Sequence, residues 1–511
     1  MNARHQRLPT AFVAREKLRE KGQFWTPPWI AEAMVAYVMR QRTDHIFDPA
    51  VGAGAFFTAA KQVAKQLSRR IKLIGADNDP AVLQQAREHG LSRHDLSHVA
   101  ITDFLLQPPK RKFRAIVANP PYIRHHRLSM SLKSKLRQFG LSVTGKPLDG
   151  RAGLHIYFLL RALQLLEEGG RLAFIVPADT CEGVFAADLW TWITKHHCLD
   201  AVVTFAPDAS PFPGVDTNAV IVMIQNARPH ETFWWVRCAE AQTAALTQWT
   251  FAGFEGSYTP SFVVRQRQLS EALTTGLSRE MIQDHTMNGP KLSDFANVLR
   301  GIATGANDFF WLSRERARSL EIPDEYLLPA VGRTRDVAGE EITPETIRAL
   351  ESSGRPTLLV SLDGQPKELF PRAVRAYLER GEQLGLHQRS LISTRNPWHK
   401  METRHAPPIL FAYLGRRHSR FIRNRVGVVP LTGFLCVYPK SEDPLFVNRL
   451  WEALRHPDTL ANLRLVAKTY GGGALKVEPR ALERLPIPAH VLAAIGLQVP
   501  QQQEQFQLQF R

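Results

Sequence analysis

Apolar residues fall into two kinds of pattern over the first 225 residues of the chain. Short runs rich in branched and aromatic residues have the length of buried strands, and they occupy residues 45–48, 71–76, 98–102, 113–118, 171–176, 199–205 and 219–224. Between them lie stretches with helical spacing, such as 28–40, where one stripe contains Ile30, Met34, Tyr37 and Val38. Strands that alternate with helices predict an α/β fold, in which a Rossmann-like sheet of seven strands has helices on both faces.

The alternation fails beyond Pro229, where strands, helices and Pro or Gly breaks are mixed. A chain of 511 residues is also too long for a single core. We therefore expect two domains, an α/β domain over residues 1–230 and a mixed α+β domain over residues 231–511.

The strand predicted over 113–118 runs into the turn Asn119-Pro120-Pro121-Tyr122. Each proline lacks a backbone N–H, so the strand must end there, at the edge where open α/β sheets bind their ligands. The turn offers an amide side chain, backbone carbonyls and an aromatic ring, which suit a planar substrate with an exocyclic amine. For four residues alone, an ordinary strand end stopped by proline is an equally simple interpretation.

The first strand leads into a glycine turn of the nucleotide-binding kind. Asp48 ends the strand, Gly52 and Gly54 follow, and a helix begins directly afterwards. Asp77 ends the next strand about twenty residues later, where a carboxylate can accept both hydroxyls of an adenosine ribose. Many tight turns look like this, and an acid after a strand can also cap a helix.

Three further residues are candidates on similar grounds. Asp103 and Phe104 follow the third strand and form a possible polar and stacking pair for an adenine ring, although Asp103 alone suits a turn. Thr26 precedes Pro27 and Pro28 and can cap the helix that begins there.

Charge and cysteine content narrow the class of protein. The net charge of +17 favours a polyanionic partner such as nucleic acid. The four cysteines form no CxxC pair, so we expect neither a disulfide framework nor a metal site. No apolar run approaches the length that spans a membrane, so the expected location is the cytoplasm.

Two basic stretches are candidate contacts with nucleic acid. Residues 110–146 surround the turn at Asn119 with ten Lys or Arg and no Asp or Glu, which favours phosphate contacts by Arg124, Lys133, Lys135 and Arg137. The second stretch runs from Arg395 to Arg425 and carries arginines interleaved with Tyr413, His418 and Phe421. This pattern suits phosphate contacts and guanine readout by Arg416, Arg417, Arg420 and Arg423. Phe212 lies in a Pro-rich loop, and an exposed ring and a ring tucked under the loop are equally open.

Taken in order, these pieces resemble the gamma-ordered N6-adenine DNA methyltransferases of restriction–modification systems. The likeness rests on FWTPP at 24–28, DPAVGAGAF at 48–56, GADNDP at 75–80, TDFL at 102–105 and NPPY at 119–122. It continues through GLHIYFLLRALQLLEEGGRLAFIVPA at 153–178, FPGVDTNAV at 212–220, and RGIATGANDFFWL and TYGGGALKVEPRALERLPIP in the second region. An acidic residue is frequent where this chain has Gly153.

The resemblance implies a class I methyltransferase sheet, followed by a target-recognition domain, with S-adenosylmethionine as cofactor and double-stranded DNA as partner. It also implies the roles of the candidates. The cofactor's methionine end would lie at Thr26, Asp48, Gly52 and Gly54, its ribose at Asp77, and its adenine at Asp103 and Phe104. A flipped adenine would contact Asn119 and the Pro120 carbonyl through its amine, in a catalytic turn that includes Pro121, and would stack on Tyr122 and Phe212. A cognate restriction endonuclease would be a separate protein.

The chemistry of these groups agrees with the implied reaction. The lone pair of an adenine amine is delocalised into the ring, so two acceptors that pull its hydrogens would localise that pair toward the methyl group. The base must also leave the duplex stack to reach the turn.

Three other interpretations stay open. An RNA amino-methyltransferase would share the chemistry. A protein-glutamine methyltransferase would share NPPY but resembles a chain with a small helical domain before the catalytic part, whereas here the catalytic part begins near residue 20. A non-catalytic DNA-binding subunit would keep the fold without binding the cofactor. A fused endonuclease would need a nuclease domain before the catalytic part. We do not expect one, because the stretch before residue 20 is too short to hold it.

Overall fold

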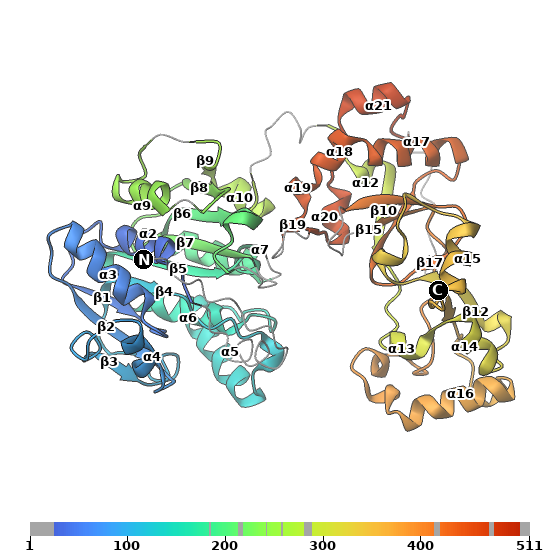
Figure 1. Ribbon diagram of the computed structural model, residues 1–511, viewed down its shortest axis with the longest axis horizontal. Helices are drawn as coiled ribbons and strands as arrows, with labels where there is room; N and C mark the ends of the chain where they lie inside the picture. Colours follow the sequence, from blue (N-terminus) through green and yellow to red (C-terminus); the bar gives the residue numbers. More distant parts are fainter. Residues whose placement is uncertain are drawn as a thin grey trace. The chain divides into compact units, whose positions relative to one another are not determined.

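A computed structural model describes residues 25–182, 185–212, 218–241, 243–256, 259–280, 289–412, 419–469 and 475–500. The chain divides into two compact units, which we call the N-terminal unit (described residues up to 280) and the C-terminal unit (289–469 and 475–500). Figure 1 shows the first in blue to green and the second in yellow to red. No described helix is long and apolar enough to cross a membrane.

The N-terminal unit is built on one sheet of nine strands in the order β3-β2-β1-β4-β5-β7-β6-β8-β9. All seven predicted strands are present, as β1 His45–Asp48, β2 Lys72–Asp77, β3 Val99–Ile101, β4 Phe113–Ala118, β5 Leu166–Pro177, β6 Cys198–Phe205 and β7 Ala219–Gln225. Strands β1 to β5 pair in parallel. Strand β7 lies antiparallel between β5 and β6.

Two strands that were not expected extend this sheet. β8 (Thr232–Cys238) pairs in parallel with β6, and β9 (Phe262–Gln268) pairs antiparallel with β8. The sheet therefore has nine strands instead of seven, and the described part of the N-terminal unit continues to Glu280. The boundary predicted at residue 230 is wrong, because β8 and β9 belong to the same sheet. No helix precedes β8, so the alternation of strands and helices that was used to place the boundary ends before the domain does.

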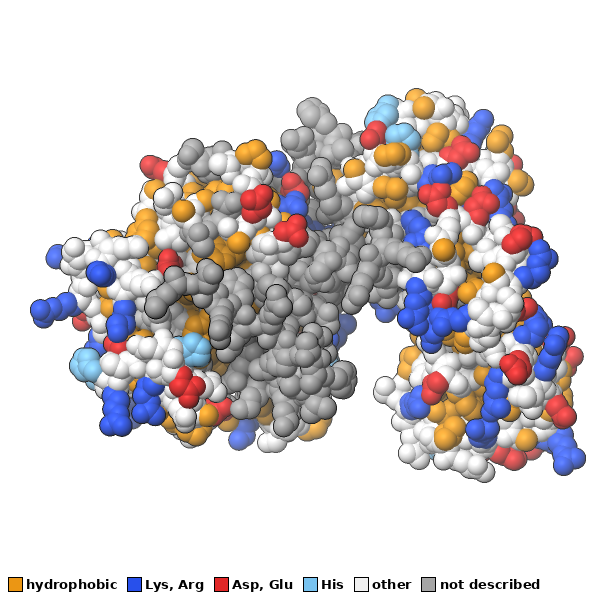
Figure 2. Space-filling model, viewed as in Figure 1, with side chains coloured by type: hydrophobic (Ala, Val, Ile, Leu, Met, Phe, Trp, Pro, Cys, Tyr) orange, Lys and Arg blue, Asp and Glu red, His pale blue; other side chains and the backbone are white. Residues whose placement is uncertain are grey.

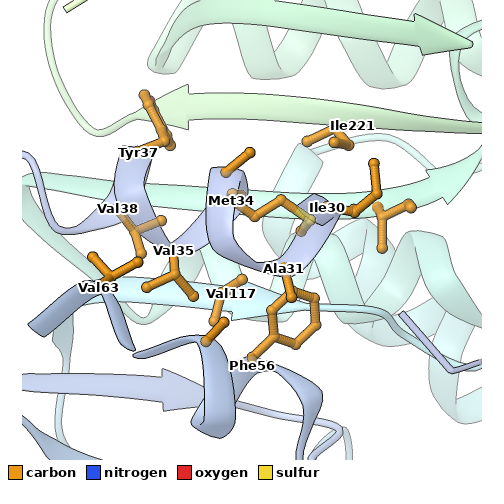
Figure 3. Close-up of a cluster of buried hydrophobic side chains, with 14 of the residues drawn as sticks. Ile30, Ala31, Met34, Val35, Tyr37, Val38, Phe56, Val63, Val117 and Ile221 are labelled. Atoms are coloured by element: carbon orange, nitrogen blue, oxygen red, sulfur yellow. The ribbon is translucent and has the colours of Figure 1, made fainter. Parts of the chain in front are cut away.

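Helices cover both faces of the sheet, as predicted. One face packs on α2 (Pro28–Val38), α3 (Ala55–Gln66) and α9 (Thr243–Phe251), and the other on α6 (Leu154–Gln164), α8 (Ala186–His196) and α10 (Leu269–Thr275). Figure 3 shows Ile30 and Met34 of α2 packed near Val117 and Ile221 of the sheet. Successive strand residues alternate between the faces, so Val117 lies in one core and Ile116 in the other. The remaining helices of this unit are α4 (Val82–Glu88), α5 (Met130–Thr144) and α7 (Asp179–Glu182).

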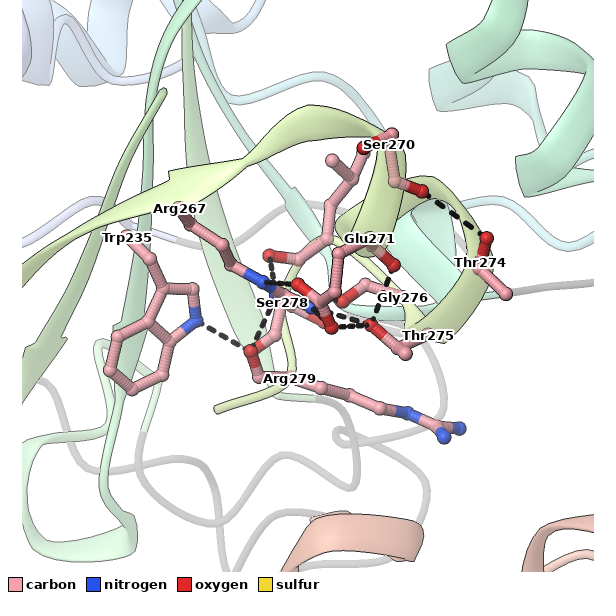
Figure 4. A network of polar contacts seen from close by, with 10 residues as sticks. Trp235, Arg267, Ser270, Glu271, Thr274, Thr275, Gly276, Ser278 and Arg279 are labelled. Carbon is pink, nitrogen blue, oxygen red and sulfur yellow. Dashed lines mark hydrogen bonds and ion pairs between the residues drawn. The ribbon is translucent and has the colours of Figure 1, made fainter. Parts of the chain in front are cut away.

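The end of the N-terminal unit is fixed by a fully buried arginine (Figure 4). Arg267 donates to both carboxylate oxygens of Glu271, at 2.7 and 3.0 Å. It also donates to the carbonyls of Gly276, Leu277 and Arg279, at 3.0, 3.2 and 2.6 Å. One side chain therefore holds the segment that follows α10 against the last strand.

Replacing Arg267 with Met should lower the free energy of unfolding of the protein by about 3 kcal/mol, because three carbonyls and a carboxylate lose their donor. Urea denaturation followed by circular dichroism measures this loss. Arg265→Met, two residues earlier on the same strand and partly exposed, is the matched control and should have little effect. Equal midpoints for the two variants would contradict the anchoring role.

The C-terminal unit is mixed α+β, as predicted. A five-stranded sheet has the order β10-β18-β15-β16-β13, and a four-stranded sheet has the order β11-β14-β12-β17. The strands are β10 Ala296–Arg300, β11 Trp311–Leu312, β12 Leu327–Val331, β13 Glu341–Ile342, β14 Leu358–Val360, β15 Ile409–Ala412, β16 Arg420–Asn424, β17 Val429–Pro430, β18 Phe434–Pro439, β19 Lys468–Thr469 and β20 Leu475–Lys476. The helices are α12 Leu292–Phe295, α13 Asn307–Phe310, α14 Arg314–Ser319, α15 Pro344–Ser352, α16 Arg372–Gln383, α17 Pro444–Arg455, α18 Pro457–Ala461, α19 Leu463–Val466, α20 Pro479–Glu483 and α21 Ala489–Ile495.

Candidate active site at the carboxyl ends of the strands

The turn after β4 places Asn119 against the start of α2. The Asn119 Nδ2 donates to Thr26 Oγ1 at 3.1 Å, and Thr26 is buried. Thr26 does not cap α2 as expected, because Pro27 takes the capping position without a side-chain bond. With its nitrogen directed at Thr26, the amide turns its oxygen away from that residue. The two residues, 93 positions apart, are thus brought together at one site.

Tyr122 forms a fixed aromatic platform beside the turn. Its hydroxyl donates to the carbonyl of Ile175 in β5 at 3.1 Å. Its ring meets His155 and Phe212 edge to face, with centroids 6.1 and 6.3 Å away. Phe212 is buried, so the tucked arrangement is the one observed, and the exposed one is wrong. Tyr122 and Phe212 nevertheless lie together, and their stacking on a base stays a prediction.

The glycine turn is tied to the end of β2. Gly52 and Gly54 have φ of +50° and +83°, in the left-handed region that favours glycine. The Gly52 N–H donates to Asp77 Oδ2 at 2.9 Å, and Asp79 N–H donates to Oδ1 at 3.0 Å. Burial raises the pKa of Asp77. Asp77 therefore shapes the glycine turn, and it lies at the strand end where the ribose contact was predicted.

Asp48 is the most buried acid of the site. Its Oδ1 accepts the Ala50 N–H at 2.9 Å, and its Oδ2 has no partner within the described part of the chain. Desolvation raises the pKa of Asp48 to about 8, and the nearby charge of Asp77 adds to the rise. Two acids at neighbouring strand ends, one with an orphaned oxygen, suit a cationic ligand.

Asp103 and the Phe104 ring differ in how they fit the predicted adenine pair, and the role of Asp103 stays a prediction. Asp103 Oδ1 accepts the N–H groups of Leu105 and Leu106, at 2.9 and 3.0 Å, so it is a turn residue. The Phe104 ring is buried among other rings, 5.3 Å from Phe158 between centroids. A ring packed in the core offers no face to a ligand. The prediction that the Phe104 ring stacks on adenine is therefore wrong.

The basic stretch around the turn is largely exposed. Ser129 caps α5 by accepting the Leu132 N–H at 3.2 Å, and the helix presents Lys133, Lys135 and Arg137. Lys135 and Arg137 are exposed, as is Arg124 before the helix, whereas Lys133 is half-buried. Within the described ranges, none of these four side chains forms an ion pair, so their charge is available to an anion.

The second basic stretch differs from its prediction. Arg416 and Arg417 lie outside the described residues. Arg420 donates to the carbonyls of Gly339, at 3.2 Å, and Val337. Arg423 donates to the Pro408 carbonyl at 2.7 Å, and burial lowers its pKa. Both guanidinium groups bond to carbonyls inside the C-terminal unit, and their predicted contacts with DNA stay a prediction.

The surface of that unit also differs from a uniform basic face. Figure 2 shows Lys and Arg side chains interspersed with Asp and Glu on the visible face of the C-terminal unit. Several arginines of this unit form ion pairs, such as Arg425 with Glu341 at 3.0 Å and Arg314 with Glu351 at 2.8 Å. Over the part of the chain that the structure describes, no cluster of three or more His, Cys, Asp or Glu could hold a metal ion.

His155 belongs to the site although the sequence did not single it out. It lies in the first turn of α6, is buried, and packs on Tyr122. A Cβ on Gly153 would lie 2.7 Å from the His155 Cε1 and 3.1 Å from the Ile123 carbonyl oxygen. This explains why glycine stands at 153, since the imidazole fills the space of a side chain there. A histidine within an apolar helical stretch carried no signal of its own.

Comparisons with known proteins agree with this architecture. Residues 10–244 match the N-6 DNA Methylase family, and residues 270–510 match the C-terminal domain of Type II methyltransferase M.Eco57I. Type II methyltransferase M.AccI of Acinetobacter calcoaceticus is 23% identical over 92% of this chain and 86% of that protein. Type II methyltransferase M.XamI of Xanthomonas campestris pv. amaranthicola is 26% identical over 92% of this chain and 85% of that protein.

Among solved structures, the Type IIL restriction-modification enzyme MmeI in complex with DNA has a TM-score of 0.54 at 14% identity. The match covers 93% of this chain and 65% of the other, and it shows a shared fold. The first region thus matches the N-6 DNA Methylase family, and nine-tenths of the chain is similar to two Type II methyltransferases, which supports a DNA methyltransferase of a restriction–modification system.

Proposed function

We propose that this protein transfers a methyl group from S-adenosylmethionine to the N6 amine of an adenine flipped out of double-stranded DNA. The observation that carries the proposal is the contact between Asn119 and Thr26. It directs the amide nitrogen of Asn119 to Thr26, so the amide oxygen faces away from that residue, and the Pro120 carbonyl follows it in the turn. Two acceptors at a rigid proline turn, beside the Tyr122 ring, fit an amine on a planar base.

The residues act by placing and polarising the amine. Asn119 and the Pro120 carbonyl accept its two hydrogens, which localises the nitrogen lone pair toward the methyl group. Tyr122 is held by its bond to Ile175 and by the two rings at its edges, so it can stack on the base without rearranging. Pro121 keeps the turn rigid. A base inside a duplex cannot reach this turn, so the adenine must be flipped.

The site also fits the cofactor. S-adenosylmethionine supplies an electrophilic methyl group on a positively charged sulfur when it is bound. The orphaned oxygen of buried Asp48, with Asp77 nearby, complements a cation. The left-handed glycines leave the backbone open to close approach, and Thr26 would contact the methionine end. Asp77 would hold the ribose.

The order of the parts supports the gamma class, with the cofactor turn before NPPY and a recognition region last. We propose that the C-terminal unit selects the target sequence, that a separate endonuclease cuts unmodified copies of it, and that the protein acts in the cytoplasm. Methylation sequencing of unmodified DNA incubated with the protein and cofactor tests the whole proposal. Methylated adenine in one sequence context is expected, whereas methylation of RNA or protein alone would overturn it.

Neutralising Lys133, Lys135 and Arg137 together should weaken binding to all duplexes alike. Each lost phosphate contact should reduce the slope of log affinity against log salt by about 0.9, because fewer counterions are released. Affinities for cognate and scrambled duplexes over a salt series measure this slope.

A control for that experiment changes the net charge equally. Lys61, Arg114 and Arg237 lie in the same unit, and each is already paired with an acid. Their triple Ala variant should leave the slope nearly unchanged. If both triple variants lost the same slope, the effect would reflect net charge, and α5 would not be a phosphate-contacting surface.

A further inference from the structure

His155 is buried with both ring nitrogens lacking a partner in the described structure. Leaving a polar group buried and unpaired carries a free-energy penalty, so such groups in native proteins are usually satisfied by something. Phenylalanine would make the same edge contact with Tyr122 without this penalty. The ring nitrogens of His155 therefore point to a hydrogen-bonding role, which phenylalanine could not fill.

The position of the ring indicates where its partner would come from. His155 packs edge to face on Tyr122, at an interplanar angle of 70°. It also folds back onto Gly153 so closely that a Cβ there would lie 2.9 Å from Nδ1. The imidazole thus forms part of the wall next to the platform on which the base would stack.

Burial also fixes the form of the ring. Desolvation lowers the pKa of His155 to about 3, so the imidazole is neutral at physiological pH. A neutral imidazole has one N–H donor and one acceptor nitrogen. Adenine offers acceptor nitrogens on its ring, whereas its amine is already assigned to Asn119 and Pro120.

We infer that His155 donates a hydrogen bond to a ring nitrogen of the flipped adenine and so helps to select the base. This inference rests on the proposed function, and it adds a base-contacting residue outside the NPPY turn. The bond would form only in the complex with DNA, which accounts for the missing partner in the free protein.

Duplexes carrying adenine, 1-deaza-, 3-deaza- or 7-deazaadenine at the methylated position test this directly. Each analogue replaces one ring nitrogen with C–H. In the wild-type protein, one analogue should lower kcat/KM roughly 10-fold beyond the others, the loss expected for one unmade hydrogen bond in a buried site. The variant His155→Phe should already show a similar loss of kcat/KM with unmodified adenine. The analogue that slows the wild-type protein should not lower kcat/KM of this variant any further. His155→Gln keeps an N–H donor and should recover part of the rate.

Two controls separate this role from a structural one. His197→Phe replaces another buried histidine, at the end of α8, and should leave the pattern of analogues unchanged. The affinity for S-adenosylmethionine should be the same in His155→Phe and wild type. The inference is overturned if His155→Phe methylates adenine at the wild-type rate, keeps the full analogue effect, or loses cofactor affinity. Failure of the wild-type protein to methylate any duplex would instead overturn the proposed function itself.

Discussion

Asn119→Ala should lower the rate of methyl transfer about 100- to 1,000-fold, the range seen when one preorganised group that stabilises a transition state is removed. The side chain supplies one of the two acceptors for the amine, and the contact with Thr26 holds it in place. Cofactor affinity should change little, because the carboxyl groups of Asp48 and Asp77 remain. Single-turnover rates at saturating cofactor isolate the chemical step.

Asn119→Asp is the matched variant for this experiment. It keeps acceptor oxygens of the same size and position but removes the N–H that bonds to Thr26. We expect a rate between those of wild type and Asn119→Ala, since the acceptor survives while its orientation is less fixed. A rate for Asn119→Ala within a few-fold of wild type would exclude the amide from the mechanism.

The sequence predicted the first half of the fold well because its signals are local. The strand over 113–118 matches β4, since two prolines end it and its interior is apolar. The resemblance to N6-adenine methyltransferases is confirmed at the level of the family. The extension of the sheet by β8 and β9 was missed because these strands do not follow the alternation with helices.

Errors within the site share one physical cause. The role of a side chain there depends on partners far away in sequence, which spacing cannot reveal. Arg420 bonds to a carbonyl 81 residues earlier, and Thr26 pairs with Asn119 instead of capping its own helix. Phe104 was placed on the correct strand end, but neighbouring helices decide that its ring lies in the core.

Asp48→Asn should make the free protein more stable above pH 8 and weaken its binding of S-adenosylmethionine. The folded pKa of Asp48, about 8, lies above the value of about 3.9 expected in the unfolded chain. The folded state therefore binds an extra proton between these values, and the free energy of unfolding falls as pH rises through that window. Asparagine has no charge to bury, so the variant should lack this component of the pH dependence. Melting temperatures of both proteins from pH 5 to 9 measure the difference.

The same substitution separates a structural acid from one that binds a cation. If ionised Asp48 holds the cationic cofactor, binding below pH 8 must expel its proton, so the wild-type protein should release more protons than Asp48→Asn on binding. Calorimetry in buffers of different ionisation enthalpy counts these protons. The orphaned Oδ2 then gains its partner in the complex, and the cost of burying the carboxyl group in the free protein is offset by cofactor affinity. Equal affinity and equal proton release in the two proteins would show that Asp48 only shapes the glycine turn through its bond to Ala50.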